Sequence, residues 1–115
     1  MTVTMYHNPR CSKSRQALKL LQEHGVEPRI VEYLKTPPDA ETLKSILRKL
    51  GMEPRALMRH KEAPYKDLNL ADPARGADAL IDSMVANPIL IERPIVMANG
   101  KAVLGRPPEK VLDIL

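Results

Sequence analysis

Aromatic residues and cysteine are scarce in this sequence of 115 residues, which has no Phe, no Trp, three Tyr and one Cys. The core must therefore be aliphatic, and we expect no nucleic-acid partner, because a binding surface of interleaved aromatic and basic side chains is missing. One cysteine cannot form an internal disulfide or a zinc site of the Cys-x-x-Cys type. His7, His24 and His60 lack the spacing of metal ligands, so we also expect no metal.

Long apolar runs are absent too. No stretch approaches the roughly 20 apolar residues that span a membrane, and Met1 is not followed by the charged and apolar regions of a signal peptide. We therefore expect a cytoplasmic protein without membrane contact. The net charge of +4 would suit an anionic partner, although a solvated basic surface explains that charge alone more simply. Length and composition predict one globular domain over residues 1–115.

The first third of the chain is typical of a strand, a helix and a strand. Residues 2–6 alternate between polar and apolar types, which favours a strand. Apolar residues then recur at helical spacing from Ser12 until Gly25, which ends the helix. Residues 29–33 predict a second strand, so this segment forms a β-α-β unit with parallel strands.

A helical block follows. Residues 36–39, Thr-Pro-Pro-Asp, predict the start of a helix whose apolar stripe ends at Gly51. Pro54 opens a short helix, residues 62–75 are typical of a loop, and residues 77–86 are again helical.

The last segment predicts a hairpin and a terminal helix. The apolar runs 95–97 and 102–104 flank Asn99 and Gly100, a strong signal for a tight hairpin turn. The prolines after Arg106 then lead into a final helix. The whole order is β-α-β, helical block, β-hairpin and terminal helix, which is an α/β fold.

The single cysteine lies in the segment HNPRCSKSR at residues 7–15. Cys11 falls where the first strand gives way to a helix, so unpaired backbone N–H groups and the helix dipole can stabilise a thiolate or an oxyanion. Arg10, Lys13 and Arg15 add positive charge. A lone cysteine is more often a small buried hydrophobe, but such residues sit in apolar runs. We therefore interpret Cys11 as a reactive nucleophile.

Two common thiol chemistries are excluded by single positions. A dithiol mechanism of the thioredoxin type needs a second cysteine three residues after Cys11, where Ser14 stands. A phosphatase loop of the low-molecular-weight type needs an arginine where the sequence has Ala17. What remains is a monothiol that takes its electrons from another molecule.

The pattern His-Asn-Pro-x-Cys-x-x-Ser-Arg resembles the active-site segment of the glutaredoxin-coupled arsenate reductases, and is most similar to their short HNPRCSKSR subgroup. The likeness covers essentially the whole chain and continues through Tyr33-Leu34, Pro37-Pro38, Arg55–Arg59, Leu80-Ile81, Asn87–Ile91, Arg93–Val96, Gly105–Pro107 and Val111-Leu112. It implies a thioredoxin-like fold with an inserted helical block and a cis peptide bond before Pro94. Arg10 departs from the pattern, which often has a small residue before the nucleophile.

The resemblance also implies the roles of the site residues. Cys11 attacks arsenate, and the oxyanion is held by Arg59, Arg93 and Arg106. Guanidinium groups suit this task, because they are planar, permanently charged and able to form paired hydrogen bonds with an oxyanion.

Two further residues can support the thiolate. His7 can act through charge or a hydrogen bond, although it could equally be a residue that merely ends the first strand. Ser14 can donate a hydrogen bond to the sulfur.

The implied reaction reduces arsenate to arsenite with glutathione as co-substrate and glutaredoxin as partner, in a monomer without a tightly bound cofactor. Two alternatives remain open. One is a monothiol oxidoreductase or deglutathionylase that acts on another small substrate. The other is a non-enzymatic regulator, since transcription-associated relatives share this fold; those usually carry a Cys-x-x-Cys switch, which Ser14 disrupts.

Overall fold

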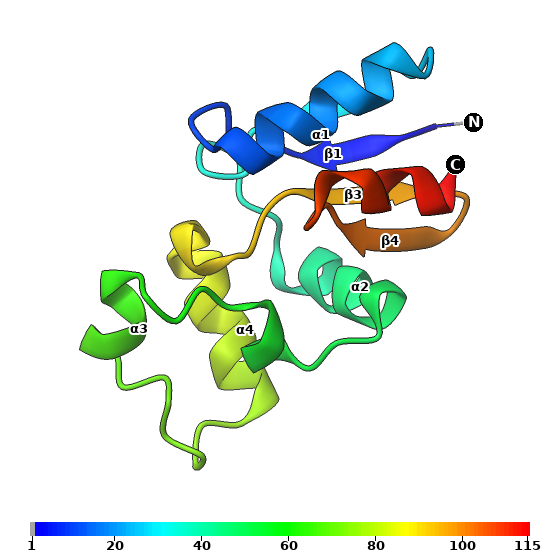
Figure 1. Ribbon diagram of the computed structural model, residues 1–115. Helices are drawn as coiled ribbons and strands as arrows, with labels where there is room; N and C mark the ends of the chain where they lie inside the picture. The colour runs from blue at the N-terminus through cyan, green and yellow to red at the C-terminus, as the bar shows by residue number, and fades with distance from the viewer. Residues whose placement is uncertain (1) are drawn as a thin grey trace. The chain divides into compact units, whose positions relative to one another are not determined.

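The computed structural model describes residues 2–115, which form two compact units. The first, called here the sheet unit, consists of the chain up to Thr36 together with Arg93–Leu115. The second, the helical unit, is Pro37–Glu92. Figure 1 shows the elements of both. The expectation of one domain over residues 1–115 stays a prediction.

The sheet unit is built on four strands in the order β2-β1-β3-β4. Their bounds are β1 Thr4–Tyr6, β2 Arg29–Val31, β3 Ile95–Ala98 and β4 Lys101–Leu104. β1 pairs parallel with β2 and antiparallel with β3, and β3 pairs antiparallel with β4. The expected β-α-β unit and hairpin are thus confirmed. The hairpin turns at Asn99 and Gly100, whose φ angles of 55° and 73° are those that a tight two-residue turn requires.

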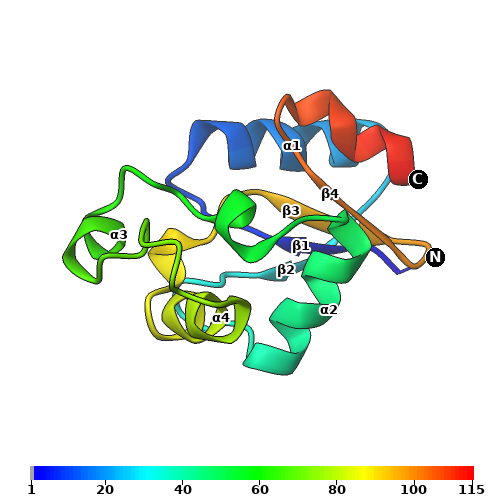
Figure 2. The ribbon, with the colours of Figure 1, turned by 90° about the horizontal axis from the view of Figure 1, so that it is seen from below.

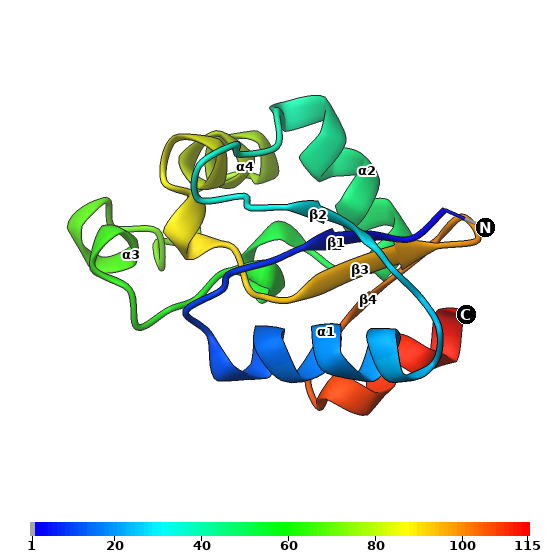
Figure 3. The ribbon, with the colours of Figure 1, turned by 90° about the horizontal axis from the view of Figure 1, so that it is seen from above.

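One face of the sheet is covered by α1, Ser12–Glu23, and by the 3-10 helix η3, Pro108–Ile114. The two helices run side by side, blue and red in Figures 2 and 3. Ala17 and Leu21 of α1 pack with Val96 and Val111 in the buried aliphatic core. The expected terminal helix is present, wound as a 3-10 helix.

The helical unit contains five short helices, which are α2 Ala40–Leu50, η1 Pro54–Leu57, α3 Ala63–Asp67, α4 Ala77–Ala86 and η2 Pro88–Leu90. Asp39 caps α2, since its carboxylate accepts a hydrogen bond of 2.8 Å from the Thr42 N–H, which also lowers the pKa of Asp39.

Helix α3 contradicts the loop predicted for residues 62–75. It spans only five residues, too few to show a helical period, and it buries Tyr65. The rest of that stretch is irregular but anchored: Arg55 donates to the carbonyls of Leu70 at 3.2 Å and Asp72 at 3.0 Å.

Within the described residues 2–115, no helix has the length and apolar character that crossing a membrane requires. The cytoplasmic location stays a prediction.

Candidate active site

Cys11 lies immediately before the first residue of α1. It is the N-cap residue, with extended backbone angles of φ −92° and ψ 123°. A tight turn precedes it, in which the Cys11 N–H donates to the Asn8 carbonyl at 3.0 Å. The Cys11 carbonyl in turn accepts from the Arg15 N–H at 3.0 Å, which begins the helix. The thiol therefore lies beside the backbone N–H groups of the first helical turn.

Cys11 as a whole residue is only 9% exposed, and the surroundings of its thiol favour the anion. Burial raises the pKa of Cys11, but several groups oppose it: the backbone N–H of Ser14, the hydrogen bond and positive charge of Arg93, and the backbone N–H of Lys13. The opposing effects prevail, so the pKa of Cys11 is lowered from its ordinary value. The thiolate, which is the nucleophilic form, is thereby populated more at neutral pH.

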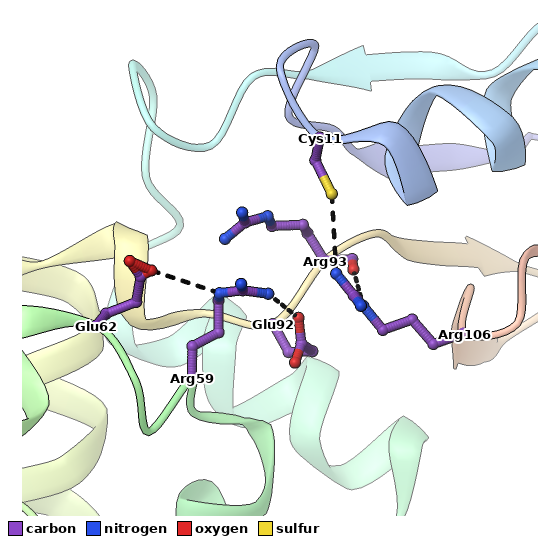
Figure 4. Close-up of polar contacts among 6 residues, drawn as sticks. All are labelled: Cys11, Arg59, Glu62, Glu92, Arg93 and Arg106. Atoms are coloured by element: carbon purple, nitrogen blue, oxygen red, sulfur yellow. Dashed lines mark hydrogen bonds and ion pairs between the residues drawn. The ribbon is translucent and has the colours of Figure 1, made fainter.

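Arg93 and Arg106 lie together beside the sulfur (Figure 4). Arg106 Nη2 is 3.8 Å from Cys11 Sγ, and Arg106 Nε donates to the Arg93 carbonyl at 2.7 Å. Arg93 precedes β3 and Arg106 follows β4, so the antiparallel hairpin brings them together. The peptide bond before Pro94 is cis, as the resemblance implied, and so is the bond before Pro107.

His7, Asn8 and Ser14 form a buried polar cluster behind the turn. His7 Nδ1 lies 2.7 Å from Ser14 Oγ, and the Asn8 N–H donates to the same oxygen at 3.1 Å. Burial lowers the pKa of His7, with the charge of Glu32 opposing and that of Arg15 assisting. A neutral His7 can accept a hydrogen bond from the Ser14 hydroxyl at Nδ1, while the Ser14 oxygen accepts one from the Asn8 N–H.

Ser14 thus meets the sulfur through its backbone. Its N–H hydrogen-bonds the thiol, whereas its hydroxyl is engaged with His7 and Asn8. The hydrogen bond to the sulfur that was expected of Ser14 comes from this N–H. Ser14 is also fully buried, which was not predicted. A signal was present, because Ser14, Ala17 and Leu21 share one face at helical spacing.

Arg59, the third predicted arginine, lies in the helical unit. Its Nη1 donates to Glu92 Oε1 at 2.6 Å, and its Nε lies 3.7 Å from Glu62 Oε2 (Figure 4). All three side chains are about a quarter exposed, with values of 24–25%. Sequence reasoning missed both carboxylates. Glu62 follows Arg59 at the spacing of a local ion pair, but nothing local could have indicated Glu92.

Comparison with known proteins places these features in a family. Residues 6–114 match the model of the ArsC family. The chain is 62% identical to the uncharacterised protein YfgD of Escherichia coli K12, over 98% of this chain and 96% of that protein. It is 50% identical to an arsenate reductase of Neisseria meningitidis, over 98% of this chain and 97% of that protein.

A solved structure shows the same similarity at the level of the fold. The arsenate reductase of Vibrio cholerae is 53% identical to this chain, and the two superpose with a TM-score of 0.98 over 100% of this chain and 98% of that one. The α/β, thioredoxin-like fold expected from the sequence is confirmed by this superposition.

Proposed function

Because the chain belongs to the ArsC family, we propose that it is an oxidoreductase that reduces arsenate to arsenite, with Cys11 as the nucleophile, glutathione as co-substrate and glutaredoxin as electron donor. The observation that carries the proposal is the contact of a thiol of lowered pKa with two arginines, Arg93 and Arg106. A thiolate beside two guanidinium groups is suited to attack an atom that carries negatively charged oxygens.

In the first step the Cys11 thiolate attacks arsenic(V). A sulfur–arsenic bond forms and an arsenic–oxygen bond breaks, and the departing oxygen takes up protons and leaves as water. Arg93 and Arg106 bind the remaining oxygens and stabilise their charge as it shifts, which lowers the barrier. No electrons reach the arsenic in this step.

Glutathione then adds to the arsenic, and a second oxygen leaves as water. A glutaredoxin thiolate attacks the glutathione sulfur, forming a mixed disulfide, and the electron pair of the arsenic–sulfur bond stays on arsenic, which becomes arsenic(III). Water cleaves the remaining bond to Cys11 and releases arsenite and the free thiol. The chain has one cysteine and cannot form the disulfide itself, so both thiols that supply the two electrons come from other molecules.

The residues around Cys11 hold the nucleophile in position. The Ser14 hydroxyl joins His7 to the Asn8 N–H and so fixes the turn that presents Cys11, while the Ser14 N–H stabilises the thiolate. Arg59 is proposed as a third oxyanion ligand on the strength of the family resemblance. Since its guanidinium is bonded to Glu92, arsenate binding by Arg59 has to compete with that carboxylate.

The test is NADPH consumption in a coupled assay with arsenate, glutathione, glutaredoxin and glutathione reductase. We expect turnover that depends on arsenate and disappears in Cys11→Ser, which is nearly isosteric and should stay folded. Arg106→Ala should raise the KM for arsenate. Absence of arsenate-dependent turnover in a protein whose Cys11 titrates as a thiolate would refute the proposal. Turnover of a glutathione mixed disulfide without arsenate would instead identify a deglutathionylase.

A further inference from the structure

A recess in the sheet unit adjoins the segment that precedes Cys11. Its volume is about 290 Å³, and it is lined by residues 7–10 on one side and by Glu32, Leu34 and Lys35 on the other. The site derived above does not use it.

The recess arises where two parallel strands end. The backbone ladder between β1 and β2 continues to a hydrogen bond of 2.9 Å from the His7 N–H to the Val31 carbonyl. Beyond this bond the chain leaves β1 for α1 and leaves β2 for the turn at residues 32–35, and the recess lies between the two stretches. Figure 3 shows β1 and β2 side by side, in blue and cyan. The recess is thus bounded by the segments that follow the carboxyl ends of two parallel strands.

Both walls of the recess are fixed by turns. On one side, the Arg10 N–H donates to Asn8 Oδ1 at 3.0 Å and the Cys11 N–H donates to the Asn8 carbonyl. On the other side, the Lys35 N–H donates to the Glu32 carbonyl at 2.9 Å. The backbone that surrounds the recess is therefore already in place before any ligand arrives, as in most small-molecule sites.

The charged side chains on the walls are two cations, Arg10 and Lys35, and one anion, Glu32. Lys35 Nζ lies 3.8 Å from Glu32 Oε1, with the side chains 79% and 42% exposed. Such an exposed ion pair is weak, so a ligand can exchange its own charges for it. Pro9 and the half-exposed Leu34 add apolar surface. The complementary ligand has two anionic groups, one cationic group and a short apolar middle.

We propose that this recess binds glutathione, a tripeptide thiol whose two carboxylates and single ammonium group match Arg10, Lys35 and Glu32. The inference rests on the proposed function, in which the glutathione thiol adds to the arsenic held by Cys11. In that addition a sulfur–arsenic bond forms, an arsenic–oxygen bond breaks, and the oxygen leaves as water with the thiol proton. Arg10 is the residue before Cys11 in the chain, so the recess adjoins the segment that carries the nucleophile.

The volume agrees with this choice of ligand. Pockets for drug-sized molecules range from roughly 300 to 1,000 Å³, and the recess, at about 290 Å³, lies at the lower limit of that range. A tripeptide fits this size, whereas a protein partner such as glutaredoxin would contact only the rim.

The first experiment measures binding without turnover. S-methylglutathione, which cannot react, is titrated into ¹⁵N-labelled full-length protein and followed by amide chemical shifts. We expect saturable shifts that concentrate at the amides of Asn8, Arg10 and residues 32–35. Arg10→Gln and Lys35→Gln should each raise the Kd about two- to fivefold, the effect of one exposed charge contact.

Lys19→Gln is the matched control, because Lys19 is also 79% exposed and also pairs with a glutamate on its own segment. It should leave the Kd unchanged. A second comparison uses the monoethyl ester of glutathione, which lacks one carboxylate. The ester should bind more weakly than glutathione to the wild type, and this difference should disappear in whichever cation variant has lost the partner of that carboxylate.

The outcomes separate this inference from the proposed function. Saturable shifts at the recess support the inference even if arsenate is not reduced, in which case only the function falls. Shifts elsewhere, or none, overturn the inference even if arsenate is reduced. Where arsenate is reduced, Lys35→Gln should raise the KM for glutathione and leave the KM for arsenate unchanged; an unchanged KM for glutathione would also overturn the inference.

Discussion

Gly105 is the position where one added methyl group should disturb both the fold and the site. It lies between β4 and Arg106, and its N–H donates to the Pro94 carbonyl at 2.9 Å. A Cβ on Gly105 would lie 2.8 Å from Pro94 Cγ and 3.2 Å from Val111 Cγ1. Contacts below 3.0 Å are essentially never observed for a Cβ, and a proline ring cannot rotate away. The backbone at Gly105 or Pro94 must therefore move in Gly105→Ala.

The size of the effect follows from two opposing contributions. Overpacking a well-filled core costs about 1–3 kcal/mol, while replacing glycine by alanine restricts the unfolded chain and returns about 0.4–1 kcal/mol. We expect a net loss of about 1–2 kcal/mol in the free energy of unfolding, which lowers the Tm by roughly 4–10 °C for a chain of this size. Gly76→Ala is the control, because a Cβ there meets no atom within 4 Å. Its weaker helix capping and its reduced unfolded-state entropy should nearly cancel.

Gly105→Ala should also alter the surroundings of the Cys11 sulfur. Arg93 precedes Pro94, and its carbonyl accepts the Arg106 Nε hydrogen bond, so movement of Pro94 displaces both arginines that contact the sulfur. We expect Gly105→Ala to raise the pKa of Cys11 and the KM for arsenate. Thermal unfolding and the pH dependence of Cys11 alkylation by iodoacetamide measure the two effects. A Gly105→Ala protein with wild-type Tm and a wild-type alkylation profile would refute the packing argument.

Three further predictions concern charges. Arg93→Gln should raise the pKa of Cys11, because it removes a positive charge and a hydrogen bond from the thiolate; an alkylation profile that does not move would contradict this. The pKa of His7 is held low, mainly by burial, so the native state binds fewer protons than the unfolded state as the pH falls through about 6.5. The free energy of unfolding should therefore decline below that pH until native His7 titrates, and Tm values of His7→Gln should lack this decline; equal slopes would exclude the effect. Glu92→Gln should lower the KM for arsenate, since the charge that competes for Arg59 is removed, whereas an unchanged KM would argue against Arg59 as a ligand.

Features set by neighbouring residues could be predicted from the sequence. The alternation at residues 2–6 and the Asn99-Gly100 turn indicated β1 and the hairpin, because strand period and turn type are local properties. The position of Cys11 at the start of α1 followed from the same reasoning. The meeting of Arg93 and Arg106 then follows from the hairpin, whose two ends must lie together.

Features that depend on distant or very short segments could not be predicted from the sequence. Helix α3 was missed because five residues do not reveal a period. The bond between Arg59 and Glu92 joins residues 33 positions apart, and no pattern near either residue indicates it. The burial of Ser14 was not predicted either: its side chain faces the core and finds its partners in the preceding turn, and only the helical spacing of Ser14, Ala17 and Leu21 indicates this.

Because Cys11 is the N-cap residue of α1, the stability of this helix depends on the chemical state of the sulfur. A thiolate at this end of a helix is stabilised by the dipole, whereas a sulfur bonded to the neutral arsenic(III) group of the last proposed intermediate loses that interaction. Since α1 carries Ala17 and Leu21 into the core, a weakened first turn reduces the stability of the sheet unit as a whole. This arsenic(III) intermediate should therefore melt at a lower temperature than the free protein, so that release of arsenite restores the more stable form and a melting curve reports whether Cys11 is free.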